Sequence, residues 1–67
     1  MLLAEALALF RRLGVDVKTM NSSDFLLAYF TLAKRYHPDR NPLGAELMAN
    51  INAARATIVN SHRGETS

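Results

Sequence analysis

The chain has 67 residues, a formal net charge of +2 at neutral pH and no cysteine. A chain of this length forms one small domain at most, with little room for a deep active-site pocket. Without cysteine it has neither a disulfide framework nor a thiolate zinc site. Its stability must therefore come from packed apolar side chains, and 49% of its residues are hydrophobic. The mildly basic charge does not by itself indicate nucleic-acid binding.

The apolar start of the chain, MLLAEALALF, is not expected to enter a membrane. Glu5 interrupts it and Arg11 and Arg12 follow it, whereas a signal peptide carries its charges before the apolar run. No stretch approaches the roughly 20 apolar residues of a membrane helix. We therefore expect a domain of the cytoplasm, or of the cytoplasmic face of a membrane if a longer parent protein is anchored there.

The first helix is predicted over about residues 2–13, where apolar residues recur at helical spacing. Gly14 follows it, and glycine readily takes the left-handed conformation that ends helices. Arg11 and Arg12 lie in the last turn, where positive charge complements the helix dipole. The residues expected to face inward are Leu3, Leu7, Phe10 and Leu13.

The second helix is predicted over about residues 22–36. Either Asn21 or Ser22 is suited to cap its N-terminus. Pro38 ends it, since the residue before a proline is pushed out of the helical region. The residues expected on its inward face are Phe25, Ala28, Tyr29, Leu32, Ala33 and Tyr36.

The segment HPDRNPLG, residues 37–44, contains two prolines, an asparagine and a glycine and is predicted to be a loop. A third helix is predicted over about residues 44–60, and the polar residues 61–67 (SHRGETS) are expected to form a flexible C-terminal tail. Residues 1–60 would then be the folded domain. The residues expected on the inward face of the third helix are Leu47, Ile51, Ala54 and Ile58.

The predicted fold class is all-α, since no alternating pattern of strand length occurs. The second and third helices are long enough to form an antiparallel hairpin, with the short N-terminal helix beside it. The tripeptide His37, Pro38 and Asp39 would lie at one exposed tip of that hairpin.

The tripeptide admits an enzymatic, a metal-binding and a structural interpretation. Catalysis by His37 and Asp39 is disfavoured because the sequence has no glycine-rich phosphate loop and no nucleophile elbow. A metal site would need His62 to fold back beside them, and a single His-x-Asp pair lacks the spacing of zinc motifs. We expect no enzyme activity, no metal and no cofactor. In the structural interpretation His37 caps the preceding helix, Pro38 stops it and Asp39 caps the next turn.

Three segments together resemble the J-domain of DnaJ-type co-chaperones. They are LALFRRLGV, AYFTLAKRYHPDRN and INAARATI, and the resemblance covers roughly residues 7–60. The stretch YHPDRN, joined to the upstream Tyr29, Leu32 and Ala33, carries most of its specificity. The fold class is thus predicted to be a small J-domain-like helical domain.

The resemblance implies a protein-docking surface. J-domains bind DnaK-type (seventy-kilodalton heat-shock) ATPases and stimulate ATP hydrolysis by that partner. His37, Pro38 and Asp39 match the signature tripeptide of the family, in which the aspartate engages an arginine of the chaperone near its interdomain linker. Lys34 and Arg35 before the tripeptide and Arg40 after it would add positive charge to this site.

The second helix departs from the family pattern. J-domains typically carry a run of lysines and arginines on its exposed face, where this chain has Leu26, Leu27, Phe30 and Thr31. One explanation is a wide apolar stripe covered by the first helix or the connection, and we expect this for Leu26. The other is a second partner surface for a domain of a longer parent protein or for another chain, and we expect this for Leu27, which points away from the stripe.

Further departures lie in the loop and the third helix. The loop after Arg40 is shorter than usual, and Arg55 stands where the family often has an aromatic residue. The sequence also lacks the short basic fourth helix, the glycine/phenylalanine-rich linker and the zinc-binding region of full DnaJ proteins, so client binding is not expected of it.

A helix-turn-helix DNA binder is a further alternative. However, the third helix begins with GAELMANIN, which holds one acid and no base, and we therefore expect no nucleic-acid partner.

Overall fold

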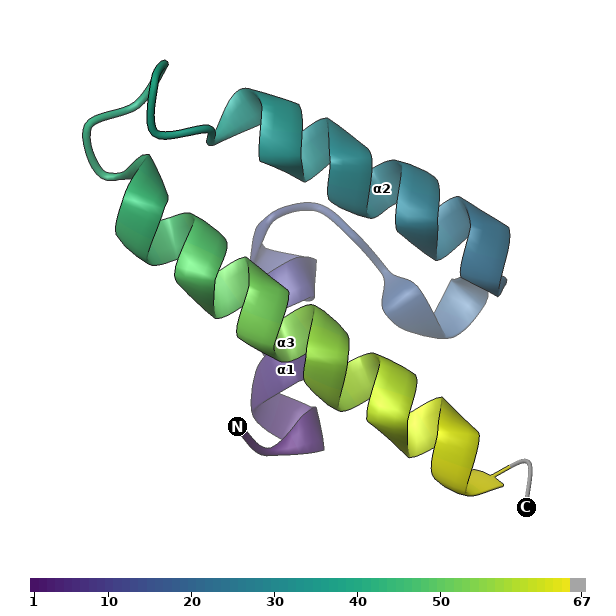
Figure 1. Ribbon diagram of the computed structural model, residues 1–67. Helices are drawn as coiled ribbons and strands as arrows, with labels where there is room; N and C mark the ends of the chain where they lie inside the picture. The colour runs from purple at the N-terminus through teal and green to yellow at the C-terminus, as the bar shows by residue number, and fades with distance from the viewer. Residues whose placement is uncertain (66–67) are drawn as a thin grey trace.

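The computed structural model describes the backbone of residues 1–65 and the side chains of residues 1–62. Its elements are α1 (Leu3–Arg12), a short 3-10 turn η1 (Val17–Thr19), α2 (Ser22–Arg35) and α3 (Gly44–Glu65). No strand occurs among residues 1–65, which confirms the all-α fold class. In Figure 1, α2 and α3 run in opposite directions on either side of the connecting loop, and α1 crosses behind α3.

α1 ends at the expected glycine. Gly14 takes a positive φ of 88°, a conformation that costs a residue with a Cβ atom free energy. The Gly14 N–H donates to the Arg11 carbonyl at 3.0 Å, and the Val15 N–H donates to the Phe10 carbonyl at 2.9 Å. These bonds satisfy carbonyl groups in the last turn of α1 and redirect the chain toward η1.

α2 begins at a side-chain cap. The Asp24 N–H donates to Asn21 Oδ1 at 2.8 Å, which makes Asn21 rather than Ser22 the N-cap. α2 ends at Arg35, and the Tyr36 N–H makes the last helical bond, to the Leu32 carbonyl at 2.9 Å. The helix thus ends within one residue of the expected position, three residues before Pro38.

α3 is longer than expected. It continues to Glu65, whereas it was expected to end near residue 60. Residues 61–65 contain no proline, and their single glycine costs a helix only about 1 kcal/mol, so nothing there forces the helix to stop. The prediction of a flexible tail from residue 61 is therefore wrong as far as Glu65, and residues 66–67 lie outside the described residues.

The core forms where α1 crosses α3, the most extensively contacting pair of helices. On α1 the inward face differs from the prediction, because Leu3 is 40% exposed and Ala6 is completely buried. Ala6 therefore belongs to the inward face of α1, together with Leu9 and Phe10. The buried core residues are Ala6, Leu9, Phe10, Val15, Phe25, Leu32, Ile51, Ala54 and Ile58.

Aromatic side chains join α2 to the other two helices. Phe25 meets Phe10 of α1 edge to face, with ring centroids 5.1 Å apart. The Tyr29 hydroxyl donates to Asn52 Oδ1 of α3 at 2.6 Å, and the Arg55 guanidinium carbon lies 4.7 Å from the centroid of the Tyr29 ring. Arg55, which departs from the family pattern, therefore contributes to the contact between α2 and α3.

Candidate functional site: the loop between α2 and α3

The tripeptide lies in the exposed loop that joins α2 to α3, at one end of the molecule (Figure 1). The His37 side chain is 59% exposed and that of Asp39 is 90% exposed. Pro38 is exposed between them. The structure therefore presents all three residues on the surface, as the sequence predicts.

Backbone hydrogen bonds to His37 hold the first half of the loop. The N–H groups of Arg40 and Asn41 both donate to the His37 carbonyl, at 2.9 Å and 3.0 Å. The Asp39 N–H donates to Nδ1 of the His37 imidazole at 3.2 Å. The hydrogen bond described for the imidazole therefore joins it to Asp39, which follows it in the chain. The structural interpretation instead expected His37 to cap the C-terminal end of α2.

The second half of the loop is held by Asn41. Its Oδ1 accepts the Leu43 N–H at 3.0 Å, and its backbone carbonyl accepts the Gly44 N–H at 2.9 Å. Pro38 and Pro42 further restrict the backbone, because a proline ring fixes φ. The tripeptide is therefore displayed on a turn whose backbone has little conformational freedom.

The Asp39 carboxylate has capacity to accept hydrogen bonds from a partner. Its Oδ2 is 3.6 Å from His37 Nδ1, beyond hydrogen-bond length, and Nδ1 already accepts the Asp39 N–H. The same nitrogen thus lies close to both the backbone N–H and the carboxylate of Asp39. An exposed carboxylate of this kind suits a guanidinium, which can bind it through two parallel hydrogen bonds.

Replacing His37 with asparagine is expected to preserve the turn, whereas His37→Gln is expected to lose it. An asparagine oxygen lies close to the position of Nδ1 and accepts the N–H two residues later, as in an Asx turn, while the glutamine oxygen lies one bond farther out. We expect up to about fivefold faster hydrogen exchange of the Asp39 amide in the glutamine variant, from the loss of one hydrogen bond. Equal exchange rates in the two variants, measured by NMR, would contradict the proposed role of Nδ1.

The basic residues predicted for the site lie on both sides of the tripeptide. Lys34 and Arg35, in the last turn of α2, and Arg40 in the loop are all exposed. The Arg35 guanidinium carbon is 5.9 Å from the centroid of the Tyr36 ring, an orientation that keeps the side chain over the end of α2. The structure thus brings all six residues predicted for chaperone binding to one end of the molecule.

An exposed apolar surface adjoins the tripeptide along α2. Leu26, Leu27 and Phe30 are 39%, 65% and 50% exposed. The prediction that Leu26 joins the core is therefore wrong, because its side chain is exposed and is not among the core residues. One end of this surface is an open groove whose lining residues are Leu27, Phe30, Thr31, Ala33, Lys34 and His37.

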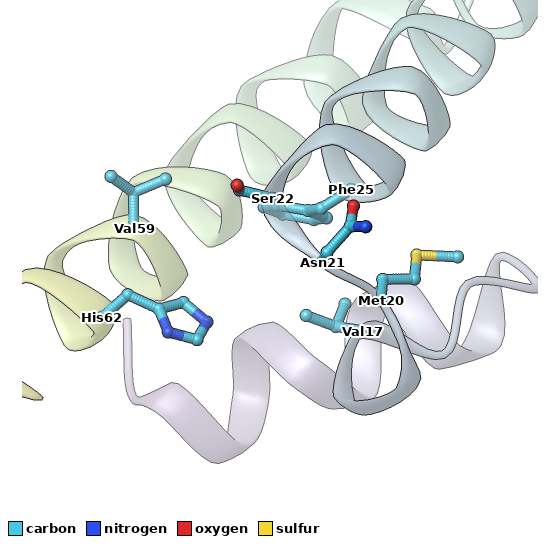
Figure 2. Close-up of a pocket in the computed structure, with 7 residues that line it drawn as sticks. All are labelled: Val17, Met20, Asn21, Ser22, Phe25, Val59 and His62. Carbon is cyan, nitrogen blue, oxygen red and sulfur yellow. The ribbon is translucent and has the colours of Figure 1, made fainter.

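The residues considered for a metal site are not brought together. His62 lies near the C-terminal end of α3, whereas His37 and Asp39 lie beyond its N-terminal end. Figure 2 shows His62 in a separate pocket, and its lining residues are Val17, Met20, Asn21, Ser22, Phe25, Val59 and His62. Among the side chains that the structure describes, no three His, Cys, Asp or Glu residues form a metal-binding group.

Asn41 and Gly44 also contribute to this site, and neither was predicted to do so. The Asn-Pro pair at 41–42 signals a turn in which the asparagine side chain bonds to a backbone N–H farther along the chain. The importance of Gly44 has no such signal, because it depends on how closely α3 approaches the end of α2.

No helix within residues 1–65 is long and apolar enough to cross a membrane.

Comparison with known proteins supports a relation to DnaJ-like proteins. The chain is 38% identical over 47 residues to a DnaJ-like protein of Mycoplasma genitalium. The aligned region covers 70% of this chain but only 15% of the relative, so the chain spans a small part of that protein's length. No family model and no solved structure matches the chain. The small all-helical fold agrees with a J-domain-like family, the class of protein that this similarity suggests.

Proposed function

We propose that this chain is a J-domain that docks on a DnaK-type heat-shock ATPase through His37, Pro38 and Asp39 and stimulates ATP hydrolysis by that partner. The observation that carries the proposal is the display of the tripeptide on a hydrogen-bonded loop, with the Asp39 side chain 90% exposed. The resemblance of the sequence to J-domains and the similarity to a DnaJ-like protein support it.

In this mechanism the Asp39 carboxylate binds a guanidinium of the partner. Pro38 and the bonds to the His37 carbonyl hold the loop in one shape, which lowers the entropy lost on docking. Lys34, Arg35 and Arg40 attract an acidic partner surface and raise the rate of encounter. Because α2 carries apolar side chains where J-domains typically carry bases, we expect this attraction to depend less on salt than in a typical J-domain.

Within this proposal the chain supplies no catalytic group, and the ATP is hydrolysed in the partner. His37 and Asp39 lie at an exposed loop tip, where water is not excluded, so they are suited to recognition rather than to acid–base chemistry. The domain would act in the cytoplasm, or at the cytoplasmic face of a membrane if a longer parent protein is anchored there.

A single-turnover assay of ATP hydrolysis by the cognate DnaK-type chaperone tests this function. We expect the hydrolysis rate to rise with the concentration of the native chain and then to saturate, as docking sites fill. Sedimentation of the same samples establishes the concentrations at which the chain stays monomeric. No increase in rate at any of those concentrations would count against the proposed stimulation.

A second candidate is a J-like adaptor that uses the apolar side of α2 and stimulates ATP hydrolysis weakly or not at all. The exposure of Leu27 and Phe30 favours it, because exposed apolar groups clustered on one helix often mark a binding surface. Its partner would be another domain of a longer parent protein or another chain.

Replacing both Leu27 and Phe30 with lysine is expected to separate the two candidates. Since both side chains are at least half exposed, the melting temperature should change little. A co-chaperone should gain affinity for the DnaK-type partner at low salt, by roughly threefold if each new charge contributes a few tenths of a kcal/mol. Unchanged affinity and salt dependence in the double variant would contradict docking of the DnaK-type chaperone on this side of α2. That result would favour the adaptor, whose partner on this side is a different protein or domain.

A further inference from the structure

The first residue of α3 lies against the last carbonyl group before the tripeptide. Gly44 is buried, and a Cβ atom built on it would collide with the Tyr36 carbonyl oxygen. The same Cβ atom would lie only 3.1 Å from the carbonyl carbons of both Tyr36 and His37. All three neighbours are backbone atoms, which cannot turn aside as a flexible side chain can. Any other residue at position 44 must therefore displace the backbone of the loop or the start of α3.

The loop has little freedom to absorb such a displacement. Only residues 36–43 separate α2 from α3, and two of them, Pro38 and Pro42, have a fixed φ. Its second half is already fixed, because the Asn41 carbonyl accepts the Gly44 N–H and Asn41 Oδ1 accepts the Leu43 N–H. A shift at Gly44 is thus transmitted back to Asn41, whose own N–H is bonded to the His37 carbonyl.

We infer that Gly44 is a positioning residue for the docking tripeptide. By letting α3 begin in contact with the Tyr36–His37 peptide, it sets the direction in which the short loop presents Asp39. This inference rests on the proposed function for its effect on the partner. The geometric part, that a side chain at position 44 changes the backbone of His37 and Asp39, stands without any partner.

The variant Gly44→Ala tests the inference, and Gly14→Ala is the matched control. Both remove a glycine beside a helix end, but Gly14 has a positive φ and open space around its Cβ position, so alanine there strains α1 without touching the tripeptide. We expect Gly44→Ala to shift the NMR signals of the Asp39 amide and the His37 Nδ1 nitrogen and to weaken chaperone stimulation by about tenfold. Gly14→Ala should lower the melting temperature and leave both the signals and the stimulation near their native values.

A rescue variant separates positioning from general destabilisation. One glycine inserted between Pro42 and Leu43 in the Gly44→Ala background lengthens the loop, so α3 can begin farther from Tyr36. We expect this insertion to restore the Asp39 and His37 signals and most of the stimulation. The same recovery is expected even if the Gly44→Ala variant alone does not fold. Native signals in Gly44→Ala, or a rescue variant that remains unfolded, would overturn the inference. If the native chain does not stimulate the chaperone, the proposed function fails, and the NMR signals still decide the role of Gly44.

Discussion

Replacing Asp39 with asparagine is expected to remove most of the stimulation of the DnaK-type ATPase while leaving the fold intact. The side chain is 90% exposed, and no described hydrogen bond that holds the loop uses its carboxylate oxygens, so unfolding free energy should change by less than about 0.5 kcal/mol. Docking should weaken by about 2 kcal/mol or more, or about 30-fold, because a partner guanidinium would lose its counter-charge.

The matched control for this variant is Asp16→Asn, the same chemical change at an exposed aspartate beside η1. It removes the same unit of negative charge but lies outside the loop, so stimulation should stay near the native value. Melting temperatures recorded by circular dichroism accompany the ATPase rates. If Asp39→Asn unfolds the chain, or if the two variants reduce stimulation equally, Asp39 does not act as a specific docking group.

The largest effect on stability is expected for Phe10→Ala. Phe10 is completely buried, and its ring packs edge to face on Phe25 at 5.1 Å, so it joins α1 to α2. Truncating a buried phenylalanine costs about 3–5 kcal/mol, and a domain of this size has a total stability of about 3–10 kcal/mol. We expect Phe10→Ala to be largely unfolded, or close to its unfolding midpoint, at room temperature.

Phe30→Ala is the matched control, because the same truncation is made at a side chain that is 50% exposed. Its melting temperature should fall far less than that of Phe10→Ala, since little buried apolar surface is lost. Chemical denaturation of both variants gives the comparison directly. A loss of stability of equal size in the two would mean that Phe30 belongs to the core, contrary to the arrangement of α1 and α3.

Local sequence signals predicted the helices well because each helix end has its own chemical cause. Gly14 ends α1 through its positive φ, Asn21 caps α2 through its side chain, and Pro38 limits the C-terminal end of α2. The exposed position of the tripeptide follows from the same signals, because a loop between two antiparallel helices lies at the surface. These features depend on residues close in sequence.

The features that the sequence did not predict depend on packing between distant segments. The burial of Ala6 rather than Leu3 depends on which face of α1 packs into the core, and helical periodicity alone does not specify this. The exposure of Leu26 depends on which side of α2 faces the rest of the domain. The role of Gly44 arises only when the start of α3 meets the Tyr36 carbonyl. Each is a tertiary effect acting on residues whose local preferences are satisfied in more than one arrangement.

The most direct test of the proposed docking is a double-mutant cycle. One variant is Asp39→Asn in this chain. The other replaces with alanine the chaperone arginine that the J-domain resemblance pairs with this aspartate. Single-turnover ATP hydrolysis is measured for all four combinations. If the carboxylate binds that guanidinium, Asp39→Asn should have little further effect on the arginine-deficient chaperone, with a coupling energy of about 1.5 kcal/mol or more. Additive effects, with Asp39→Asn lowering stimulation by the same factor on both chaperones, would contradict the contact.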